Sequence, residues 1–245
     1  MIKPGNRILI HCPENIQSTL PKEFGLLTWN AYKKNSSVEF KDYLSHIHQR
    51  HPTNILLLQE AAEPSVFEQL LPNYETLFFS NLKMKRKSFG VATASCTKHV
   101  SSSYLISHHQ EFLLQTHKSL LISVYPLANK QQLVVVNIHA INFKNIKAYK
   151  HEINLLMNNI LFHDGPLIIS GDFNTWSKRR HGVIDMMMNE LGLEKVKFEH
   201  SYNTKKFLKY PLDLTLCRGL KLNQAISLNC GKISDHNPLY ARFSI

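Results

Sequence analysis

The sequence predicts an α/β protein in which two β-sheets pack face to face and helices cover the outside. Short apolar runs recur along most of the chain, and they are typical of strands because polar or turn-forming residues follow them. Some runs alternate with polar residues and others are apolar throughout, so the strands are expected to be buried on one face or on both. Helical periodicity is confined to a few segments. The sequence shows no repeat, low-complexity tract or flexible linker, so one domain is the simplest organisation.

The first part of the chain is expected to begin with an irregular segment. Residues 1–23 contain Pro4, Pro13 and Pro21, which interrupt regular structure. The apolar run 24–29 predicts a buried strand that ends at Asn30, and the run 54–60 predicts a second strand that ends at Glu60. Helices are expected over residues 38–50 and 64–71.

The rest of the chain continues this alternation of strands and helices. Residues 145–162 form the clearest helical pattern, because apolar residues such as Ile146, Tyr149 and Ile153 recur with a helical period. A second helix is expected near residues 181–191. Strands are expected over residues 74–79, 90–95, 119–125, 132–139, 167–170, 212–217, 222–228 and 237–243.

The composition is that of a basic globular protein. A hydrophobic content of 43% is ordinary for a folded domain, and no apolar run approaches the roughly 20 residues that a membrane-spanning helix needs. Lysine and arginine outnumber aspartate and glutamate by 29 to 18, so we expect a polyanionic partner: nucleic acid, anionic lipid or a phosphorylated small molecule. Four scattered cysteines and the lack of a signal-peptide pattern favour a cytoplasmic protein, and we expect a monomer.

Polar side chains stand where the predicted strands end. Five separate positions carry an amide, a carboxylate or an imidazole beside an apolar run: Asn30, Glu60, His139, Asp172 with Asn174, and Asp235 with His236. Each is ordinary on its own, and Asp172 and Asn174 after Gly171 could serve only to form a turn. Together they favour a chemical site, because catalytic residues often gather on loops at the end of a rigid sheet.

The same residues stand in motifs that resemble those of the endonuclease/exonuclease/phosphatase superfamily. That superfamily includes DNase I, apurinic endonucleases of the exonuclease III type, inositol-polyphosphate 5-phosphatases and neutral sphingomyelinases. The resemblance covers residues 24–243, and the strings N-I-H-A-I-N-F from Asn137 and N-T-W-S-K-R-R from Asn174 are similar to the bacterial YafD-like branch. The ordered motifs are L-L-T-W-N ending at Asn30, L-L-Q-E ending at Glu60, V-N-I-H ending at His139, S-G-D-F-N ending at Asn174, P-L-D-L around Asp213 and S-D-H-N-P around Asp235 and His236.

This resemblance implies a DNase I-like four-layer α/β sandwich, with two mixed β-sheets face to face and helices outside. It assigns residues 24–245 to a single catalytic domain. It also implies hydrolysis of phosphoric esters at one metal-dependent site, usually with Mg²⁺ and with Mn²⁺ as an alternative. Tyr32 stands where some members carry a second acidic residue, so one metal ion is expected.

Three residues are expected to serve the metal. Glu60 is the expected direct ligand, since Mg²⁺ prefers oxygen ligands and typically takes only one or two carboxylates from a protein. The alternative is a surface glutamate at the start of a helix. Asn30 is expected to support the metal or to bind phosphate, and Asp235 to bind the metal directly or through another ligand. The alternative for both is an ordinary polar residue of a strand end or turn.

Five residues are expected to act on the ester. Asp172 would orient and polarise the attacking water, and Asn174 would hold that water or a phosphate oxygen without adding negative charge. His139 would donate a hydrogen bond to a phosphate oxygen, although a lone histidine on an apolar strand is more often a core residue. His236 would contact the scissile phosphate while Asp213 holds its other ring nitrogen and raises its basicity. The alternative for Asp213 is a plain aspartate at a strand edge.

Two basic clusters bear on the substrate. The segment Lys83–Lys87 carries four cations in five residues, and Lys178, Arg179 and Arg180 follow the S-G-D-F-N motif closely. We expect the second cluster to contact substrate phosphates, with Trp176 stacking on a base or sugar. Solvated loop lysines and a rim aromatic are the alternatives, and for the first cluster the two interpretations are equally good.

The sequence leaves three functions to compare. The first is a metal-dependent phosphodiesterase, a nuclease that hydrolyses DNA or RNA by metal-assisted attack of water. The second is a phosphatase or phosphodiesterase acting on inositol phosphates or phospholipid headgroups, for which the sequence shows no obvious apolar wedge beside the site. The third is a catalytically inactive nucleic-acid-binding module, because a fold does not by itself establish activity.

Overall fold

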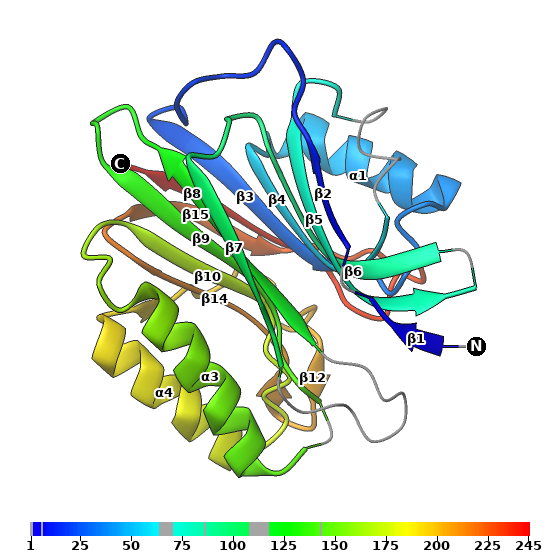
Figure 1. Cartoon of the computed structure of the whole chain (residues 1–245), viewed down its shortest axis with the longest axis vertical. Helices are drawn as coiled ribbons and strands as arrows, with labels where there is room; N and C mark the ends of the chain where they lie inside the picture. The colour runs from blue at the N-terminus through cyan, green and yellow to red at the C-terminus, as the bar shows by residue number, and fades with distance from the viewer. Residues whose placement is uncertain (1, 6, 64–70, 86, 108–117, 143) are drawn as a thin grey trace.

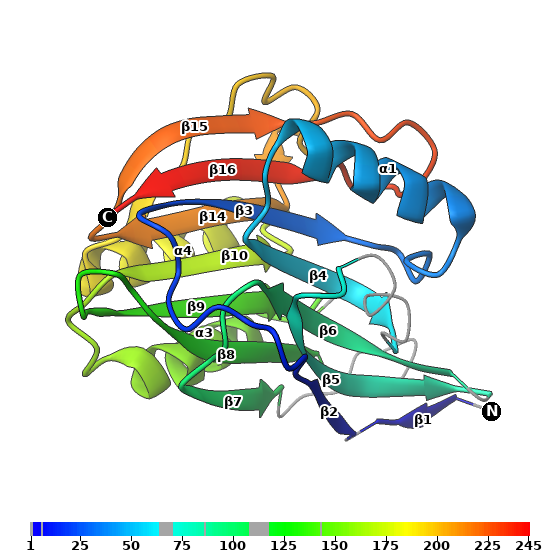
Figure 2. The same cartoon turned by 90° about the horizontal axis from the view of Figure 1, so that it is seen from above.

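Two β-sheets packed face to face form the centre of the computed structural model, which describes residues 2–5, 7–63, 71–85, 87–107, 118–142 and 144–245 (Figure 1). Helix α1 (Val38–Arg50) covers the outer face of one sheet. Helices α3 (Ile146–Ile160) and α4 (Lys178–Leu191) lie side by side on the outer face of the other sheet (Figure 2). The predicted four-layer α/β sandwich is therefore confirmed.

The first sheet has eight strands and carries α1. Its central strands β3 and β4 are parallel, and all its other pairs are antiparallel, so the sheet is mixed. Its strands, in spatial order, are β1 (Ile2–Pro4), β5 (Glu75–Met84), β6 (Lys87–Ser95), β4 (Ile55–Ala62), β3 (Glu23–Asn30), β16 (Leu239–Ser244) and β15 (Lys221–Ser227), with β2 (Ile8–His11) paired to β5.

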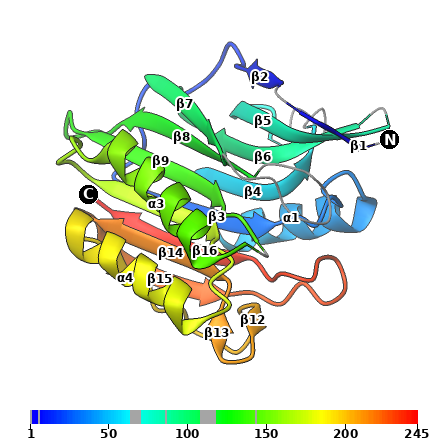
Figure 3. The ribbon, with the colours of Figure 1, turned by 60° about the horizontal axis from the view of Figure 1, so that its bottom comes forward.

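The second sheet has six strands and carries α3 and α4. It is also mixed, because β9 and β10 are parallel whereas β10 and β14 are antiparallel. Its strands, in spatial order, are β11 (Glu194–Lys195), β14 (Asp213–Arg218), β10 (Leu167–Asp172), β9 (Gln132–His139), β8 (Ser119–Pro126) and β7 (Ser101–Ile106). A separate hairpin of β12 (Lys206–Phe207) and β13 (Tyr210–Pro211) lies at the periphery, below α4 and β15 in Figure 3.

Some elements differ from those predicted. The segment 1–23 was expected to be irregular, but it contributes β1 and β2 to an edge of the first sheet. Strand β7 and the short strands β11, β12 and β13 were not expected, because the serine-rich and polar sequences of such edge segments lack an apolar run. The helix expected over 64–71 lies almost entirely outside the described residues. The division into a lead-in and one catalytic domain stays a prediction.

Helix α4 begins three residues earlier than predicted because of its cap. The side chain of Ser177 accepts a hydrogen bond from Arg180 N, and Gly192 ends the helix with a φ of 63°. Ser37 and Asn145 cap α1 and α3 in the same way. The basic cluster after the S-G-D-F-N motif therefore forms the first turn of α4.

Among the described helices, none is long and apolar enough to cross a membrane.

A buried pair of amides interrupts the apolar layer between the sheets. Gln59 of β4 donates from Nε2 to Asn137 Oδ1 of β9 at 2.7 Å. Asn137 Nδ2 in turn donates to the carbonyl oxygens of Ala92 at 2.8 Å and Leu58 at 3.2 Å. Both side chains are fully buried. Displacing one sheet over the other would break these hydrogen bonds inside the core, so the pair favours the observed alignment of the two sheets at this end of the sandwich.

We predict that Asn137→Ala lowers the free energy of unfolding by about 2–3 kcal/mol, because it leaves a buried donor and two carbonyls without their partner. Urea denaturation would measure the change. Asn129→Ala, in an exposed turn, is the control and should change stability by less than about 0.5 kcal/mol. A loss as small as that of the control would show that the amide pair does not hold the sheets together.

Candidate active site

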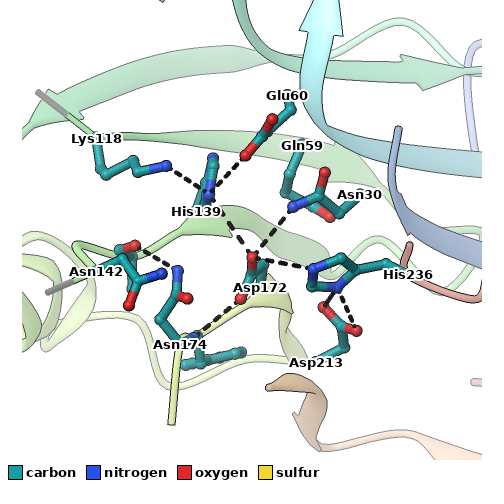
Figure 4. A network of polar contacts seen from close by, with 12 residues as sticks. Asn30, Gln59, Glu60, Lys118, His139, Asn142, Asp172, Asn174, Asp213 and His236 are labelled. Carbon is teal, nitrogen blue, oxygen red and sulfur yellow. Dashed lines mark hydrogen bonds and ion pairs between the residues drawn. The ribbon is translucent and has the colours of Figure 1, made fainter. Parts of the chain in front are cut away.

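The ends of strands from both sheets meet at one edge of the sandwich. Asp172, the last residue of β10, is the register partner of His139 on β9 and of Asp213 on β14. Figure 4 shows His139 and Asp172 facing Glu60 and Asn30, which come from the first sheet, and Asp213 facing His236. A cavity of about 420 Å³ lies between them, and eight of the residues singled out in the sequence line it: Asn30, Glu60, His139, Asp172, Asn174, Trp176, Asp235 and His236.

Glu60 faces this cavity because β4 is bulged. The pairing of β4 with β6 shifts in register between Leu58 and Ala61, and Glu60 adopts a φ of 47°. Few residues other than glycine occupy this left-handed region, and a bulge redirects the side chain that it carries. Asn35 fixes the bulge, since its amide oxygen accepts from the backbone N–H of Ala62 at 2.6 Å and its Nδ2 donates to the carbonyl of the same residue.

Backbone conformations of positive φ gather at this edge. Besides Glu60, the non-glycine residues Tyr32, Lys33 and Asn174 have φ values of 47°, 62° and 50°. Each costs on the order of 1–3 kcal/mol and persists only where the surrounding structure holds it. Such strain is typical of sites where side chains must point in a required direction.

Asp172 is held in place by both of its carboxylate oxygens. Oδ1 accepts from the backbone N–H of Asn174 at 3.0 Å, and Oδ2 accepts from Asn30 Nδ2 at 3.1 Å. Gly171, before it, has a φ of 145°, and a Cβ there would lie 2.0 Å from the carbonyl oxygen of Ile138. Glycine is therefore required for β10 to approach β9 closely just before the site.

Asp172 and Asn174 form a turn and also line the cavity, and their roles in catalysis stay a prediction. The contact from Asn174 N to Asp172 Oδ1 is the hydrogen bond of an Asx turn. The other oxygen, Oδ2, points into the cavity, where it lies 3.7 Å from His139 Nε2 and 3.9 Å from His236 Nε2. Asn174 uses one amide proton on the carbonyl of Ala140 at 2.9 Å. The turn is thus the device that orients the carboxylate.

His236 and Asp213 form a buried pair. Nδ1 of His236 lies 2.8 and 3.0 Å from the two carboxylate oxygens of Asp213. Burial by itself would lower the pKa of His236, but the negative charges of Asp213 and Asp172 outweigh it and raise the pKa to about 10. The ring is therefore protonated at neutral pH, with Nδ1–H bound to Asp213 and Nε2–H directed towards Asp172.

Two contacts fix the loop that carries His236. Trp29 donates from Nε1 to the carbonyl oxygen of His236 at 2.8 Å, and Ser234 donates from Oγ to the carbonyl of Asn30 at 2.7 Å.

Burial raises the pKa of Asp172 to about 6, although the positive charge of His236 acts to lower it. The edge thus combines a carboxylate that is a stronger base than usual with an imidazolium 3.9 Å away.

His139 is a neutral acceptor in this arrangement. Its Nε2 lies 2.9 Å from Nζ of Lys118. A lysine ammonium can only donate, so Nε2 accepts and the ring proton is on Nδ1. Burial, together with the charge of Lys118, lowers the pKa of His139 well below its usual value. The sequence analysis expected His139 to donate to a phosphate; here the donor that faces the cavity is Lys118.

The cations of the cavity are not those of the predicted basic cluster. Lys118 and Lys205 line it, and the ammonium of Lys33 contacts the carboxylate of Glu60. Lys178 and Arg179 are exposed in the first turn of α4 and do not line the cavity. They can contact only those parts of a substrate that extend beyond it. The described residues of the Lys83–Lys87 cluster lie exposed on the β5–β6 hairpin and do not line it either.

Arg180, which the sequence predicted to bind substrate, is buried and does not line the cavity. Its side chain is 1% exposed, and its guanidinium donates to the carbonyls of Ile141 at 2.7 Å, Asn174 at 3.0 Å and Lys144 at 3.1 Å. The same group stacks on the rings of Tyr149 and Trp176. Arg180 therefore joins the loops that follow β9 and β10.

Residues 27–236 match the sequence model of the Endonuclease/Exonuclease/phosphatase family. The chain belongs to this family. The UPF0294 protein of Erwinia tasmaniensis is 32% identical over 257 residues, which span 99% of this chain and 92% of that protein.

Solved structures of other proteins share the fold. An endonuclease/exonuclease/phosphatase from Beutenbergia cavernae has a TM-score of 0.71 at 12% identity, over 92% of this chain and 72% of that one. D. rerio TDP2 in complex with a single-strand DNA product has a TM-score of 0.67 at 15% identity, over 92% of this chain and 100% of that one. At these identities, the likeness establishes the fold of the chain but not its substrate.

One side of the cavity fits the divalent cation that family membership implies. Glu60 and Asp172 offer carboxylates and Asn30 offers an amide oxygen, which are the hard oxygen donors that Mg²⁺ prefers. Ammonium groups already lie against two of the carboxylates, Lys33 against Glu60 and Lys205 against Asp235 at 3.2 Å. These two carboxylates thus already bind cationic groups.

Asp172, Asp213 and His236 also bring one ligand atom each within 4.8 Å of one another. This set suits a metal less well than the oxygen donors do. Nδ1 of His236 is engaged by Asp213 and its Nε2 carries a proton at neutral pH, so neither nitrogen has a lone pair to offer. We interpret Asp213 and His236 as an ion pair that faces the carboxylate of Asp172.

Sequence reasoning missed several cavity residues. Lys118 follows a segment without a strand pattern, and Lys205 and Phe207 lie in a polar stretch that resembles a surface loop. Asn142 lines the cavity and accepts from Trp176 Nε1 at 3.0 Å. The string N-I-H-A-I-N-F contains Asn142 and was the only signal that could have indicated it.

We predict that Asp213→Asn lowers both the pKa of His236 and the stability of the fold. The pKa of His236 is raised in the folded state, so its stabilising effect is complete near pH 6 and decreases as the pH rises from about 6.5 to about 10. The variant should be about 3 kcal/mol less stable than the wild type near pH 6 and closer to it near pH 10. Histidine NMR titration and urea denaturation at both pH values would measure this. Asp235→Asn, at an exposed carboxylate, is the control, and an equal effect of the two changes would contradict the assignment.

Proposed function

We propose that the protein is a metal-dependent phosphodiesterase, a nuclease that hydrolyses DNA or RNA by attack of water. The observation that carries the proposal is the meeting, in one cavity, of the basic carboxylate of Asp172, the imidazolium of His236 and the oxygen donors Glu60 and Asn30. The family to which the chain belongs is one of phosphoric-ester hydrolases.

The proposed cofactor is Mg²⁺, with Mn²⁺ as an alternative, held by Glu60 and Asn30 with Asp235 nearby. When bound, such an ion neutralises phosphate oxygens and stabilises the charge that develops as the ester bond breaks. Lys33 contacts only Oε2 of Glu60, so Oε1 would be the oxygen that holds the ion.

Asp172 is the proposed base. Its Oδ2 faces the cavity and would take the proton of the attacking water, for which a carboxylate of raised pKa is better suited than an ordinary one. Asn30 and the backbone of Asn174 hold the carboxylate, so its orientation does not depend on the substrate. This division leaves the second amide proton of Asn174 for the water or for a phosphate oxygen.

His236 is the proposed donor to the scissile phosphate. Its Nε2–H would bind a non-bridging oxygen while Asp213 stabilises the positive ring, which is the arrangement that an oxyanion requires. Lys118, whose ammonium donates to His139, would add a second positive charge to the cavity. Because both donors are in place before the substrate binds, little reorganisation accompanies the reaction.

Nucleic acid is the preferred substrate because the cavity also has an aromatic side. Trp176, Phe207 and Tyr32 line it beside the catalytic groups, and aromatic rings next to cations suit bases next to phosphates. The complex of D. rerio TDP2 with a single-strand DNA product supports nucleic acid for a related fold. Substrate binding by Trp176, Lys178 and Arg179 stays a prediction.

A second candidate, a phospholipid headgroup, is favoured by one observation. The sequence showed no obvious apolar wedge, but Phe207 and Leu208 on the β12–β13 hairpin are 54% and 84% exposed beside the cavity. Lysines flank them, as an anionic bilayer would require. Cytoplasmic location and a monomeric state are further parts of the proposal, which fractionation and size-exclusion chromatography would test.

We predict that the purified protein cleaves DNA or RNA oligonucleotides with Mg²⁺ and loses activity in EDTA. Glu60→Gln and Asp172→Asn should each lower kcat/KM by roughly a hundredfold or more with the fold intact, as judged by circular dichroism. Glu190→Gln, on the exposed face of α4, is the control. Phospholipid vesicles are the parallel substrate. Cleavage of lipid alone would favour the second candidate, and no turnover in any assay would favour an inactive binding module.

We predict a bell-shaped dependence of kcat/KM on pH. The rate should rise through pH of about 6 as Asp172 loses its proton, and fall towards pH of about 10 as His236 loses its own. The two apparent pKa values of this profile describe the Asp172–His236 pair rather than either residue alone, because the two groups interact directly. Asp213→Asn should move the alkaline limb to lower pH, because burial then lowers the pKa of His236. An alkaline limb that stays in place in this variant would exclude His236 as the proton donor.

A further inference from the structure

The β12–β13 hairpin separates two cavities. Lys205, Phe207 and Leu212 line the catalytic cavity. Lys206, Lys209 and Pro211 line a second cavity of about 440 Å³. Because successive side chains of an extended strand point to opposite faces, the alternation of these residues places the two cavities back to back across the hairpin.

The second cavity is strongly positive. Four lysines line it, namely Lys195, Lys197, Lys206 and Lys209. In the part of the chain that the structure describes, no carboxylate lies within 4.0 Å of any of these four ammonium groups. Asp213 also lines the cavity, but its charge is taken up by the imidazolium of His236. The cavity therefore presents an excess of positive charge beside the catalytic pair.

We infer that this second cavity binds a phosphate group of the same nucleic-acid strand whose scissile phosphate lies in the catalytic cavity. The inference rests on the proposed nuclease function and deepens it, because it assigns a second subsite and the path of the strand between the two cavities. The strand would cross the hairpin from one cavity to the other. The subsite consists of Lys195 and Lys197 on one side and Lys206 and Lys209 on the hairpin.

The hairpin tip favours an unpaired strand. Leu208 is 84% exposed and has a φ of 55°, a conformation that leucine rarely adopts and that asparagine or glycine would adopt at lower cost. Leu208 and the half-exposed Phe207 form an apolar tip next to the lysines of the second cavity. Unpaired bases offer apolar faces to Leu208 and Phe207, whereas paired bases are already stacked on one another. A polyphosphorylated headgroup could also fill the second cavity, with the bilayer that carries it covering Leu208 and Phe207, and the test below separates it from a nucleic-acid strand.

The test compares a long substrate with a minimal one. The double variant Lys195→Gln/Lys197→Gln changes only the second cavity and leaves the hairpin and the catalytic cavity untouched. Fluorescence anisotropy with a labelled single strand of about 20 nucleotides, in EDTA, reports binding whether or not the protein turns over. We expect the dissociation constant to rise roughly tenfold. The slope of its logarithm against the logarithm of the salt concentration should fall by about 1–2.

Turnover then locates the effect. With Mg²⁺, KM for the oligonucleotide should rise in the variant, while kcat/KM for bis(p-nitrophenyl) phosphate, which fills only the catalytic cavity, should stay within about twofold. Lys147→Gln/Lys150→Gln removes two exposed cations of α3 that line neither cavity and is the matched control, with less than about a twofold change expected.

Three results would overturn the inference. The first is unchanged affinity of the Lys195/Lys197 variant for the oligonucleotide, and the second is an equal or larger loss in the control. The third is lysine-dependent binding of inositol hexakisphosphate without any of the oligonucleotide, which would assign the subsite to a headgroup. If the wild type hydrolyses neither substrate but binds the strand through these lysines, the nuclease proposal fails while the phosphate subsite stands.

Discussion

The alignment of the two sheets is the constraint on which the site depends. Asn30 and Glu60 come from the first sheet, whereas Asp172 comes from the second, so no single sheet could assemble the cavity. The hydrogen bond between Gln59 and Asn137 joins the two sheets immediately before these side chains. Apolar packing alone would tolerate a small displacement of one sheet over the other, but a buried amide would then lose its partner.

Opposite charges in the cavity are arranged so that each group keeps a separate role. Asp213 stabilises the positive charge of His236, and this charge in turn limits how far burial raises the pKa of Asp172. Lys118 holds His139 as a neutral acceptor. A base and an acid can therefore coexist 3.9 Å apart without exchanging a proton. The positive φ values of Glu60 and Asn174 are part of the same arrangement, because they direct groups that regular strands would turn away.

The sequence predicted the sandwich and most strands because apolar runs record burial directly. It also predicted the convergence of Glu60, Asp172 and His236, since each lies at the end of such a run and within a family motif. It failed at Arg180, because a basic residue in a polar segment gives no sign that three carbonyls will enclose it. It missed the hairpin for a similar reason: the meaning of Lys206 and Phe207 lies in which cavity each faces, and that depends on tertiary structure.

The burial of Arg180 between two aromatic rings has a consequence for how the edge tolerates changes in acidity. Carboxylates and imidazoles around the cavity gain and lose protons over the range in which the protein would operate. A guanidinium does not, since it keeps its charge at every pH at which proteins are folded. The loops that follow β9 and β10 are thus anchored by a group that cannot titrate. Protonation changes in the cavity therefore leave the hydrogen bonds between these loops unchanged.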